Sequence, residues 1–296
     1  MLEIIPPPFG VENVVRACGT ADSVQPLLDG VETLKTQEAS YLAHVVGGTL
    51  DVFPKRPTAI TDSIADAANS AYTSRLRSKA SDARGFYDYM RLTAPNGLCP
   101  NCMVRDAAAL DHHLPREHFP ALAIQPSNLV PICTSCNLKK SSHVAANPSD
   151  RFLHPYFDRL GAWDWIRADV VEVEGSPLIF RIAPHASWDS ITEDRVRRHV
   201  ERFDLLHLFG EKAAALLGNL RVAFESHWTD APEGAREARV ALEASRLARS
   251  HAAKGRAPWQ AAAFTAWSES AWFCDRGWRT VDDESVLRAA LASLKM

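Results

Sequence analysis

Two C-x2-C pairs form the pattern in this sequence that most directly predicts chemistry. The first pair is Cys99 and Cys102, and the second, separated from it by 30 residues, is Cys133 and Cys136. A C-x2-C turn brings two thiolates close together, and two such turns supply the four ligands of a tetrahedral zinc ion. The spacing therefore predicts one structural Zn2+ site formed by all four cysteines.

Disulfide bonds and a redox centre are the alternative interpretations of these cysteines. The amino-terminal segment MLEIIPPPFG lacks the basic stretch and the long apolar run of a secretory signal, which indicates a cytoplasmic chain and argues against disulfides. A redox pair opens a helix after a strand in a βαβ unit, and neither CPNC nor CTSC has that setting. Cys18 and Cys274 are distant in sequence, so we interpret them as small buried apolar residues.

Three residues close to the cysteines have side chains suited to hydrolysis of a phosphodiester bond. Asp111 offers a carboxylate and Asn137 an amide oxygen, and these ligands suit Mg2+ or Mn2+ better than zinc. His112 is a candidate general base, because imidazole titrates near neutral pH. A divalent ion can stabilise the negative charge on the phosphate and on the departing oxygen. The residue types are therefore suited to metal-dependent hydrolysis of a phosphodiester bond.

The segments LDHHLP and NLVPICTSCNLKK resemble the motif of the HNH (ββα-metal) endonuclease family, in its four-cysteine zinc form with asparagine in place of the last histidine. The resemblance implies that Asp111 and Asn137 bind the catalytic Mg2+ or Mn2+ and that His112 activates the water. It also implies that Asn128 fixes the loop that orients His112. Lys140 has the charge required to contact a phosphate.

The register of the Asp-His-His run is open to two interpretations. Strand alternation places Asp111 and His113 on one face, with His112 on the other. The family pattern instead pairs Asp111 with His112, and we adopt it because the strand ends there and its twist can bring adjacent side chains together. His113 is then a buried or supporting residue.

One departure from the bacteriocin-type members of the family concerns the end of the motif. Those proteins place a further histidine one turn after the last motif residue, where this chain has Ser141, with His143 two residues further on. We therefore expect two direct protein ligands and a water-rich, Mg2+-like coordination.

A longer stretch, from LDHHLP through NLKKSS to the FLHPYFD segment at residues 152–158, resembles the HNH nuclease subunits of Septu-type and retron-linked antiphage systems. That resemblance implies a DNA endonuclease controlled by an ATPase partner. The motif does not choose between DNA and RNA, and a stand-alone nuclease is a further alternative. A zinc ribbon without catalytic activity would explain the cysteines, but it has no need of the Asp, His, Asn and Lys residues. The FLHPYFD segment is most simply interpreted as a buried aromatic connection.

The pattern along the chain predicts an α+β fold that is mainly helical, in three regions. Residues 1–92 form an amino-terminal helical region, residues 93–150 form the HNH ββα-metal core with its zinc site, and residues 151–296 form a β-hairpin followed by helices. The expected elements are helices within 24–46 and 60–92, strands at 110–115 and 128–132, a helix from 137, a hairpin of 170–174 with 178–182, and helices over 192–225, 235–253 and 259–296. No apolar run approaches the roughly 20 residues that cross a bilayer, so no membrane association is expected.

The net charge of −3 is unusual for a free-standing nucleic-acid binder. Basic residues are concentrated on or near two predicted helices, where they form either a solvated helix face or a surface that contacts phosphates along a nucleic acid. Those on the first helix are Arg195, Arg197, Arg198 and Arg202, and those near the second are Arg236, Arg239, Arg246, Arg249, Lys254 and Arg256.

Four of the eight tryptophans lie near the carboxy terminus at roughly helical spacing, at positions 259, 267, 272 and 278. This spacing predicts either core residues or a face that binds a partner protein. The acidic balance, the long helical flanks and these tryptophans together motivate the expectation of an ATPase partner that supplies part of the DNA affinity.

Overall fold

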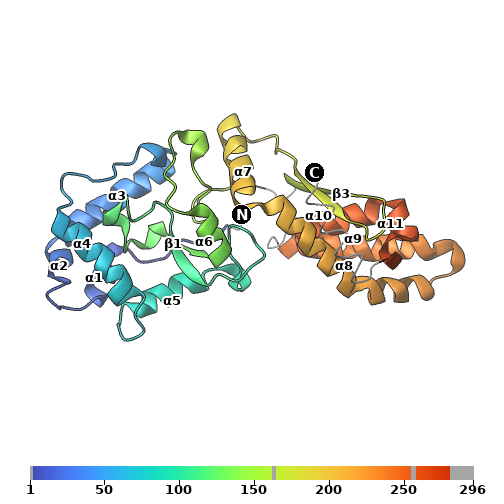
Figure 1. The fold of residues 1–296 in the computed structure, drawn as a ribbon, viewed down its shortest axis with the longest axis horizontal. Helices are drawn as coiled ribbons and strands as arrows, with labels where there is room; N and C mark the ends of the chain where they lie inside the picture. Colours follow the sequence, from blue (N-terminus) through green and yellow to red (C-terminus); the bar gives the residue numbers. More distant parts are fainter. Residues whose placement is uncertain (1–2, 162–164, 255–257, 281–296) are drawn as a thin grey trace. The chain divides into compact units, whose positions relative to one another are not determined.

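The computed structural model describes residues 3–161, 165–254 and 258–280. The chain divides into two compact units, which are described separately below. The first comprises Met1–Arg159 and Ser190–Phe203, and the second comprises Leu160–Asp189 and Asp204–Met296. The described part of the chain is mainly helical, with two small two-stranded sheets, one in each unit (Figure 1).

The first unit consists of short helices around a small antiparallel sheet. In chain order its elements are α1 (Val11–Ala17), α2 (Gln25–Asp29), α3 (Val31–Val46), α4 (Asp62–Ala71), a π-helical turn (Tyr72–Leu76), α5 (Arg84–Leu92), β1 (Ala109–His112), β2 (Leu129–Ile132), α6 (Thr134–Lys140) and α7 (Ser190–Phe203).

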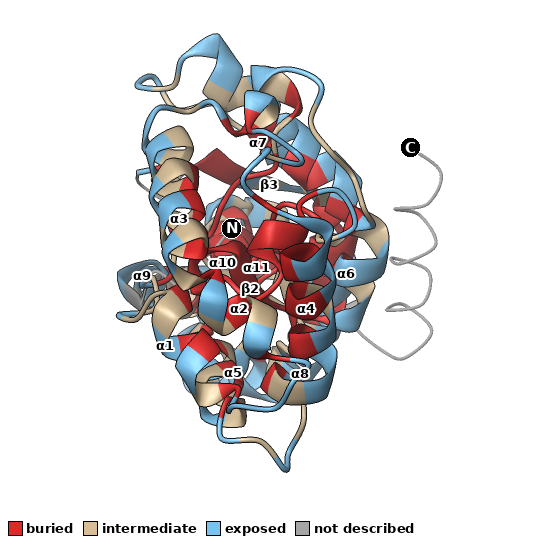
Figure 2. Cartoon of the chain, turned by 90° about the vertical axis from the view of Figure 1, so that its left-hand side faces the viewer, coloured by how far each residue is buried: buried red, intermediate tan, exposed pale blue. Residues whose placement is uncertain are grey.

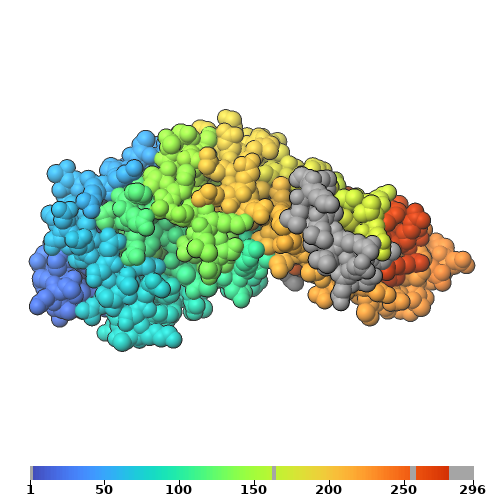
Figure 3. All heavy atoms as spheres, in the orientation of Figure 1, coloured from blue at the N-terminus to red at the C-terminus, as the bar shows by residue number. Residues whose placement is uncertain are grey.

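One apolar core joins the amino-terminal helices to the segment that carries the sequence motif. Val14 of α1 and Ala68 of α4 belong to the same buried cluster as Leu110 of β1 and Leu129 of β2. Buried residues line the inward sides of these helices, and the blue-to-green part of the chain forms a continuous body (Figures 2 and 3). The predicted boundaries near positions 92 and 150 both lie inside this unit.

Helix α4 and the π-helical turn after it connect the helical core to β1. The Thr61 side chain caps α4 by accepting a hydrogen bond from the Ile64 amide at 3.3 Å. The alanine-rich inward face of α4 is buried, so the helix can pack closely. At the start of the π-helical turn, the buried Tyr72 hydroxyl donates to the Leu110 carbonyl at 3.0 Å. This hydrogen bond fixes the π-helical turn beside β1.

The FLHPYFD segment is a buried connection, as its simplest interpretation predicted. Tyr156 is fully buried, and its hydroxyl donates to the Leu129 carbonyl of β2 at 2.8 Å. The amide of Ile4 donates to the Pro155 carbonyl at 3.0 Å. The segment therefore braces the strand that leads into the second cysteine pair.

The arginines of α7 are engaged within the unit rather than forming a free basic stripe. Arg195 bonds both oxygens of the Asp158 carboxylate, at 2.8 and 2.6 Å. Arg197 pairs with Glu193 on its own helix, and Arg198 pairs with Asp150 at 2.6 Å. Arg202 donates to the Lys140 carbonyl at 3.5 Å. These contacts give the phosphate-tracking interpretation of this helix no support.

The Arg195–Asp158 pair makes a testable contribution to stability. We expect Arg195→Met to lower the free energy of unfolding by about 3–5 kcal/mol, because it leaves a largely buried carboxylate without its cation. Arg197→Met is the matched control on the same helix and should cost less than about 1 kcal/mol, since that pair is exposed. Urea unfolding of the three proteins measures both effects.

The pH dependence of this pair follows from the pKa of Asp158. Burial raises that pKa, but the Arg195 guanidinium and the His154 amide outweigh burial and hold it below its usual range. The stabilisation is therefore complete above the unfolded pKa of about 3.9 and is lost as the pH falls through the lower folded pKa. The difference between the parent and Arg195→Met should shrink below about pH 4, and a constant difference down to pH 2 would contradict this account.

The second unit contains a hairpin and a group of helices. Its elements are β3 (Ile166–Val170), β4 (Leu178–Ile182), α8 (Leu205–Thr229), α9 (Arg236–Lys254), α10 (Pro258–Glu269) and α11 (Ala271–Asp275).

The hairpin of the second unit differs from its predicted form in the first strand. That strand ends at Val170 instead of beginning there, because Val170 pairs with Leu178 and the chain needs the intervening residues to turn. Gly175 and Ser176 adopt positive φ angles of 84° and 45° in this turn. The helical pattern predicted over 192–225 is likewise interrupted, at Asp204, whose φ and ψ of 55° and 51° separate α7 from α8.

The carboxy-terminal tryptophans are mainly core residues. Trp259, Trp267 and Trp278 are buried, whereas Trp272 is half-buried. Trp267 stacks on the buried ring of Phe273, with ring centroids 5.5 Å apart. These tryptophans therefore give no support to a partner-binding face. Among the residues described, no helix has both the length and the apolar character required to cross a membrane.

Candidate metal centre and active site

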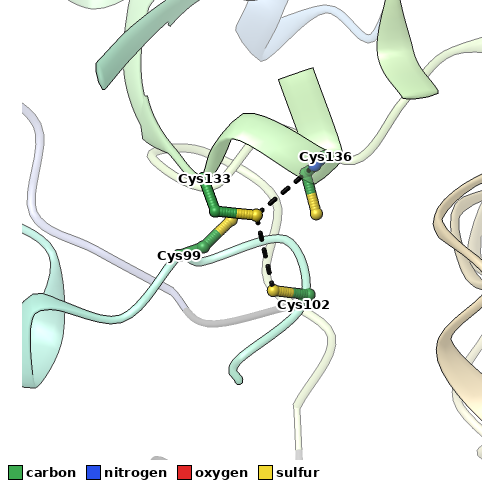
Figure 4. A group of neighbouring side chains, drawn as sticks. All are labelled: Cys99, Cys102, Cys133 and Cys136. Carbon is green, nitrogen blue, oxygen red and sulfur yellow. Dashed lines mark hydrogen bonds between the residues drawn. The ribbon is translucent and has the colours of Figure 1, made fainter. Parts of the chain in front are cut away.

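The four predicted zinc ligands converge in one buried cluster. Their sulfur atoms all lie within 4.8 Å of one another, and the Sγ atoms of Cys102 and Cys133 are 3.9 Å apart. Tetrahedral zinc with Zn–S bonds of about 2.3 Å requires sulfur atoms about 3.8 Å apart. Figure 4 shows the side chains turned toward one another, two from a loop and two from the start of α6. The cluster therefore has the donor set and geometry of a structural Zn2+ site.

Local backbone geometry explains how each C-x2-C pair forms. Cys133 is the N-cap of α6, and its Sγ accepts a hydrogen bond from the Cys136 amide at 3.3 Å. In the first pair, the Met103 amide donates to the Cys99 carbonyl at 2.8 Å, and Met103 has a φ of 60°. Cys18 and Cys274 are buried elsewhere, and burial raises the pKa of each thiol to about 11, which makes both unreactive.

Helix α7 supports the first cysteine pair through a residue that the sequence did not single out. His199 is fully buried, and its Nε2 lies 3.1 Å from the carbonyl of Asn101, which stands between Cys99 and Cys102. A carbonyl only accepts hydrogen bonds, so Nε2 carries the hydrogen. Burial lowers the pKa of His199 to about 3. No local spacing relates His199 to the motif, since 98 residues separate it from Asn101.

Strands β1 and β2 and helix α6 bring the candidate catalytic residues to one cavity. The strands pair antiparallel, with Asp111 opposite Val130 and His112 opposite Leu129, and α6 follows directly. Asp111, His112 and Asn137 all line a cavity of about 310 Å³. The sequence predicted all three elements, although β1 ends at His112 rather than at residue 115.

The hydrogen bonding of His112 determines which ring nitrogen can act as a base. Its Nε2 lies 2.8 Å from the Ala123 carbonyl and therefore carries the hydrogen. Nδ1 is then the unprotonated nitrogen of the neutral ring. Burial lowers the pKa of His112 to about 3, so the ring is neutral at physiological pH. The Tyr72 ring packs edge-on against the imidazole, with centroids 4.5 Å apart.

Asn128 ties together the loop around His112. Its Oδ1 accepts from the Leu114 amide at 2.8 Å, and its Nδ2 donates to the carbonyls of Leu114 and Leu122 at 3.0 and 3.3 Å. Leu114 lies two residues after His112, and Leu122 directly precedes Ala123, the hydrogen-bond partner of the imidazole. Asn128 is fully buried, so these bonds are shielded from water.

Lys140 forms an ion pair in the structure, where its charge alone suggested a phosphate contact. Its buried Nζ lies 2.9 Å from Asp111 Oδ2 and donates to the His112 carbonyl at 2.8 Å. Lys140 does not line the cavity. Burial raises the pKa of Asp111, and the lysine only partly offsets this effect. In this geometry Lys140 positions the Asp111 carboxylate and is not available to a substrate.

His113 lies in a different environment from Asp111 and His112. Its ring stacks on that of His154, with centroids 4.0 Å apart, and burial lowers its pKa well below the usual value. The Tyr156 amide donates to His154 Nδ1, and His154 Nε2 therefore donates to the Tyr41 hydroxyl at 3.0 Å. The alternation of side chains along a strand does not extend to His113, because β1 ends at His112.

The residues after α6 also have definite positions. Ser141 lines the cavity, with a φ of 53° at the end of the helix. His143 Nε2 lies 3.2 Å from an oxygen of Asp150, and the His143 ring packs against Phe152. His143 does not line the cavity that Asp111 and Asn137 share.

Several lining residues of the cavity come from parts of the chain that the sequence motif does not include. They are Tyr72, Arg77 and Tyr87 from the amino-terminal helical region, and Arg116 and Glu117 from the loop after β1. The sequence predicted the amino-terminal helices as scaffold only.

Comparisons with known proteins identify one distant relative. The chain is 28% identical over 153 residues to Protein ea31 of Escherichia phage lambda. The similarity covers 50% of this chain and 51% of that protein, so the chain spans about half the length of the curated relative that it matches. No protein-family model matches the chain, and no solved structure matches it. The resemblance to HNH endonucleases therefore depends on the motif residues themselves.

Proposed function

We propose that this protein is a metal-dependent HNH endonuclease that hydrolyses phosphodiester bonds of DNA. The observation that carries the proposal is the cavity that Asp111 and His112 of β1 share with Asn137 of α6, the helix that also carries Cys136 of the four-cysteine cluster. A carboxylate, an imidazole and an amide oxygen at one polar cavity form a donor set suited to hydrolysis.

His112 is the general base in this proposal. The Ala123 carbonyl holds the tautomer in which Nδ1 is free of hydrogen, and Nδ1 takes the proton from the attacking water. Asn128 keeps the Ala123 and Leu114 parts of the loop in place around the ring. The base is therefore oriented before substrate binds, which reduces the entropic cost of reaching the reactive geometry.

Asp111 and Asn137 fit a hard divalent cation. Their oxygen donors share one polar cavity, and the cavity is large enough for an ion that retains several waters. Mg2+ or Mn2+ bound here would stabilise the charge that develops on the phosphate and on the leaving oxygen. The Lys140 ammonium holds Asp111 Oδ2 and keeps this carboxylate in position.

The proposal predicts the loss of cleavage when either oxygen ligand is removed. We expect Asp111→Ala and Asn137→Ala each to abolish Mg2+-dependent nicking of supercoiled plasmid, because a two-ligand site cannot lose half of its protein oxygens and still hold the ion. Leu138→Ala is the control, because Leu138 follows Asn137 on the same helix, is exposed and does not line the cavity. Agarose-gel conversion of supercoiled to nicked plasmid gives the rate.

Cleavage that persists undiminished in EDTA, with zinc still bound, would contradict the proposed metal-dependent mechanism. RNA of the same sequence, run in parallel, distinguishes cleavage of RNA from cleavage of DNA. If neither substrate is cleaved under any divalent-ion condition, a zinc-binding interaction module without catalytic activity becomes the better assignment.

We further propose that the nuclease is the effector of an antiphage system and works with an ATPase partner. The net charge of −3 and the internal pairing of the α7 arginines support a partner that supplies part of the DNA affinity. Co-expression with the protein encoded by the adjacent gene, followed by affinity purification, tests for a complex. Rapid DNA cleavage by the isolated chain, without a complex and without protection from phage, would favour a stand-alone nuclease.

A further inference from the structure

The cavity that contains the candidate catalytic residues carries two arginines from outside the motif. We propose that Arg77 and Arg116 form a phosphate-binding pair that positions a nucleic-acid backbone at Asp111 and His112. This inference rests on the proposed nuclease function, and it makes the amino-terminal helical region part of the substrate site. The guanidinium group suits this role because its planar fork of N–H donors matches two oxygens of a phosphate.

Arg116 is held next to the candidate base by its surroundings. Its Nη1 donates to the Asn69 carbonyl at 3.2 Å and to Thr73 Oγ1 at 3.4 Å. The guanidinium lies 5.1 Å from the centre of the Tyr72 ring, which in turn contacts His112. These contacts use Nη1 and one face of the group, so the remaining N–H donors are available to a ligand at the cavity.

Arg77 has a fixed backbone and an exposed side chain. It directly follows the π-helical turn, and its carbonyl accepts a hydrogen bond from Arg84 Nη1 at 2.6 Å. Within residues 3–161, 165–254 and 258–280, no ion pair or hydrogen bond engages its guanidinium. An arginine that is held by its backbone at a cavity, without a carboxylate partner, is suited to a ligand that brings its own negative charge.

The charge balance of the cavity favours an anion. The Asp111 carboxylate is compensated by Lys140 at 2.9 Å. The other acidic lining residue is the exposed Glu117, and its single negative charge is outnumbered by the two guanidinium groups. Ser141 and Ser142 add hydroxyl donors to the same lining. Among the described residues neither Arg77 nor Arg116 pairs with a carboxylate, whereas Arg195, Arg197 and Arg198 of α7 each do.

Binding measurements in a background that cannot cleave test the proposal. We would place Arg77→Gln and Arg116→Gln separately in His112→Gln protein and measure anisotropy with duplex DNA, single-stranded DNA and RNA of one sequence. Each substitution should weaken binding about 10- to 100-fold, the effect of one charge-assisted hydrogen bond. With duplex DNA, the slope of log K against log salt concentration should fall in magnitude by about 0.9 for each arginine that is replaced. Weaker binding of all three nucleic acids would support recognition of the phosphate backbone that they share.

Lys79→Gln is the matched control, because Lys79 is an exposed cation two residues from Arg77 that does not line the cavity. It should bind like the background protein, and an equal loss there would overturn the assignment in favour of a general basic surface. Arg116 also contacts Asn69 and Thr73, so its replacement removes packing contacts as well as charge. The Arg116→Lys variant keeps the charge and should therefore retain the salt slope.

The two proposals fail in distinguishable ways. Cleavage by the parent protein, together with unchanged affinity and salt slope in both glutamine variants, would overturn the phosphate pair and leave the nuclease intact. Arginine-dependent binding in a protein that cleaves nothing would support the phosphate pair and overturn the proposed hydrolysis.

Discussion

His112→Ala is expected to lower the cleavage rate by about 10²–10⁴-fold while the fold and the zinc content remain unchanged. Among the described residues, the substitution removes the only imidazole that lines the cavity with Asp111 and Asn137. The zinc cluster should be unaffected, because His112 contributes no ligand to it. Single-turnover cleavage of a labelled duplex measures the rate, and metal analysis of the same sample measures zinc.

His112→Gln separates the role of the base from the role of packing. The glutamine amide can still donate to the Ala123 carbonyl, as Nε2 of the histidine does, but it offers no nitrogen that accepts a proton. We expect the glutamine variant to be as inactive as the alanine variant and more stable. His118→Ala, in an exposed loop position outside the cavity, should cleave at the parental rate.

His113→Ala gives the outcome that would reverse the assignment. Because His113 stacks on His154 in the interior, we expect this substitution to lower stability and to leave the rate of the folded fraction within a few-fold. If His113→Ala abolished cleavage in well-folded protein and His112→Ala did not, His113 would be the base.

Cys133→Ser is expected to prevent folding of the first unit. Cys133 is both a predicted zinc ligand and the N-cap of α6, so the substitution disrupts the metal site and the start of the helix that carries Asn137. For small zinc modules the binding energy of the ion is folding energy, on the order of 10–16 kcal/mol, which exceeds the stability of a typical domain. Yield of soluble protein and zinc per chain are the measurements, and the parent should contain about one zinc.

Cys18→Ala is the control for the loss of a buried cysteine. Cys18 packs in the core and lies outside the cluster, so the variant should keep one zinc per chain and lose only packing energy. A soluble, zinc-free Cys133→Ser protein with full activity would show that the cluster does not hold a structural ion.

Local spacing was sufficient to predict the four-cysteine cluster, because its members come in pairs on single turns of the chain. Cys133 and Cys136 are brought together by the helix start that Cys133 itself caps. The same applies to Asp111 and His112, which are neighbours in sequence. Composition and helical pattern also predicted helices in the second unit as far as residue 280, apart from the break at Asp204 that a left-handed backbone angle introduces. The rest of the helical prediction for 259–296 lies outside the described residues.

Other features required the tertiary structure, because they depend on packing between segments far apart in the chain. Arg77 reaches the cavity only because the π-helical turn packs against β1, where Tyr72 bonds the Leu110 carbonyl. The sequence also did not predict the contacts of Lys140. Its charge suggested a phosphate contact, whereas in the structure it is buried and forms an ion pair with Asp111.

The interior position of the tryptophans also depends on packing. Helical spacing alone allows a core or an exposed face, and contacts with residues such as Phe273 decide between the two. Sequence thus determined which residues are candidates for the chemistry, through the short spacings within the two cysteine pairs and between Asp111 and His112. Tertiary packing determined which charged side chains are paired inside the protein, because that pairing depends on which distant segments fold against one another.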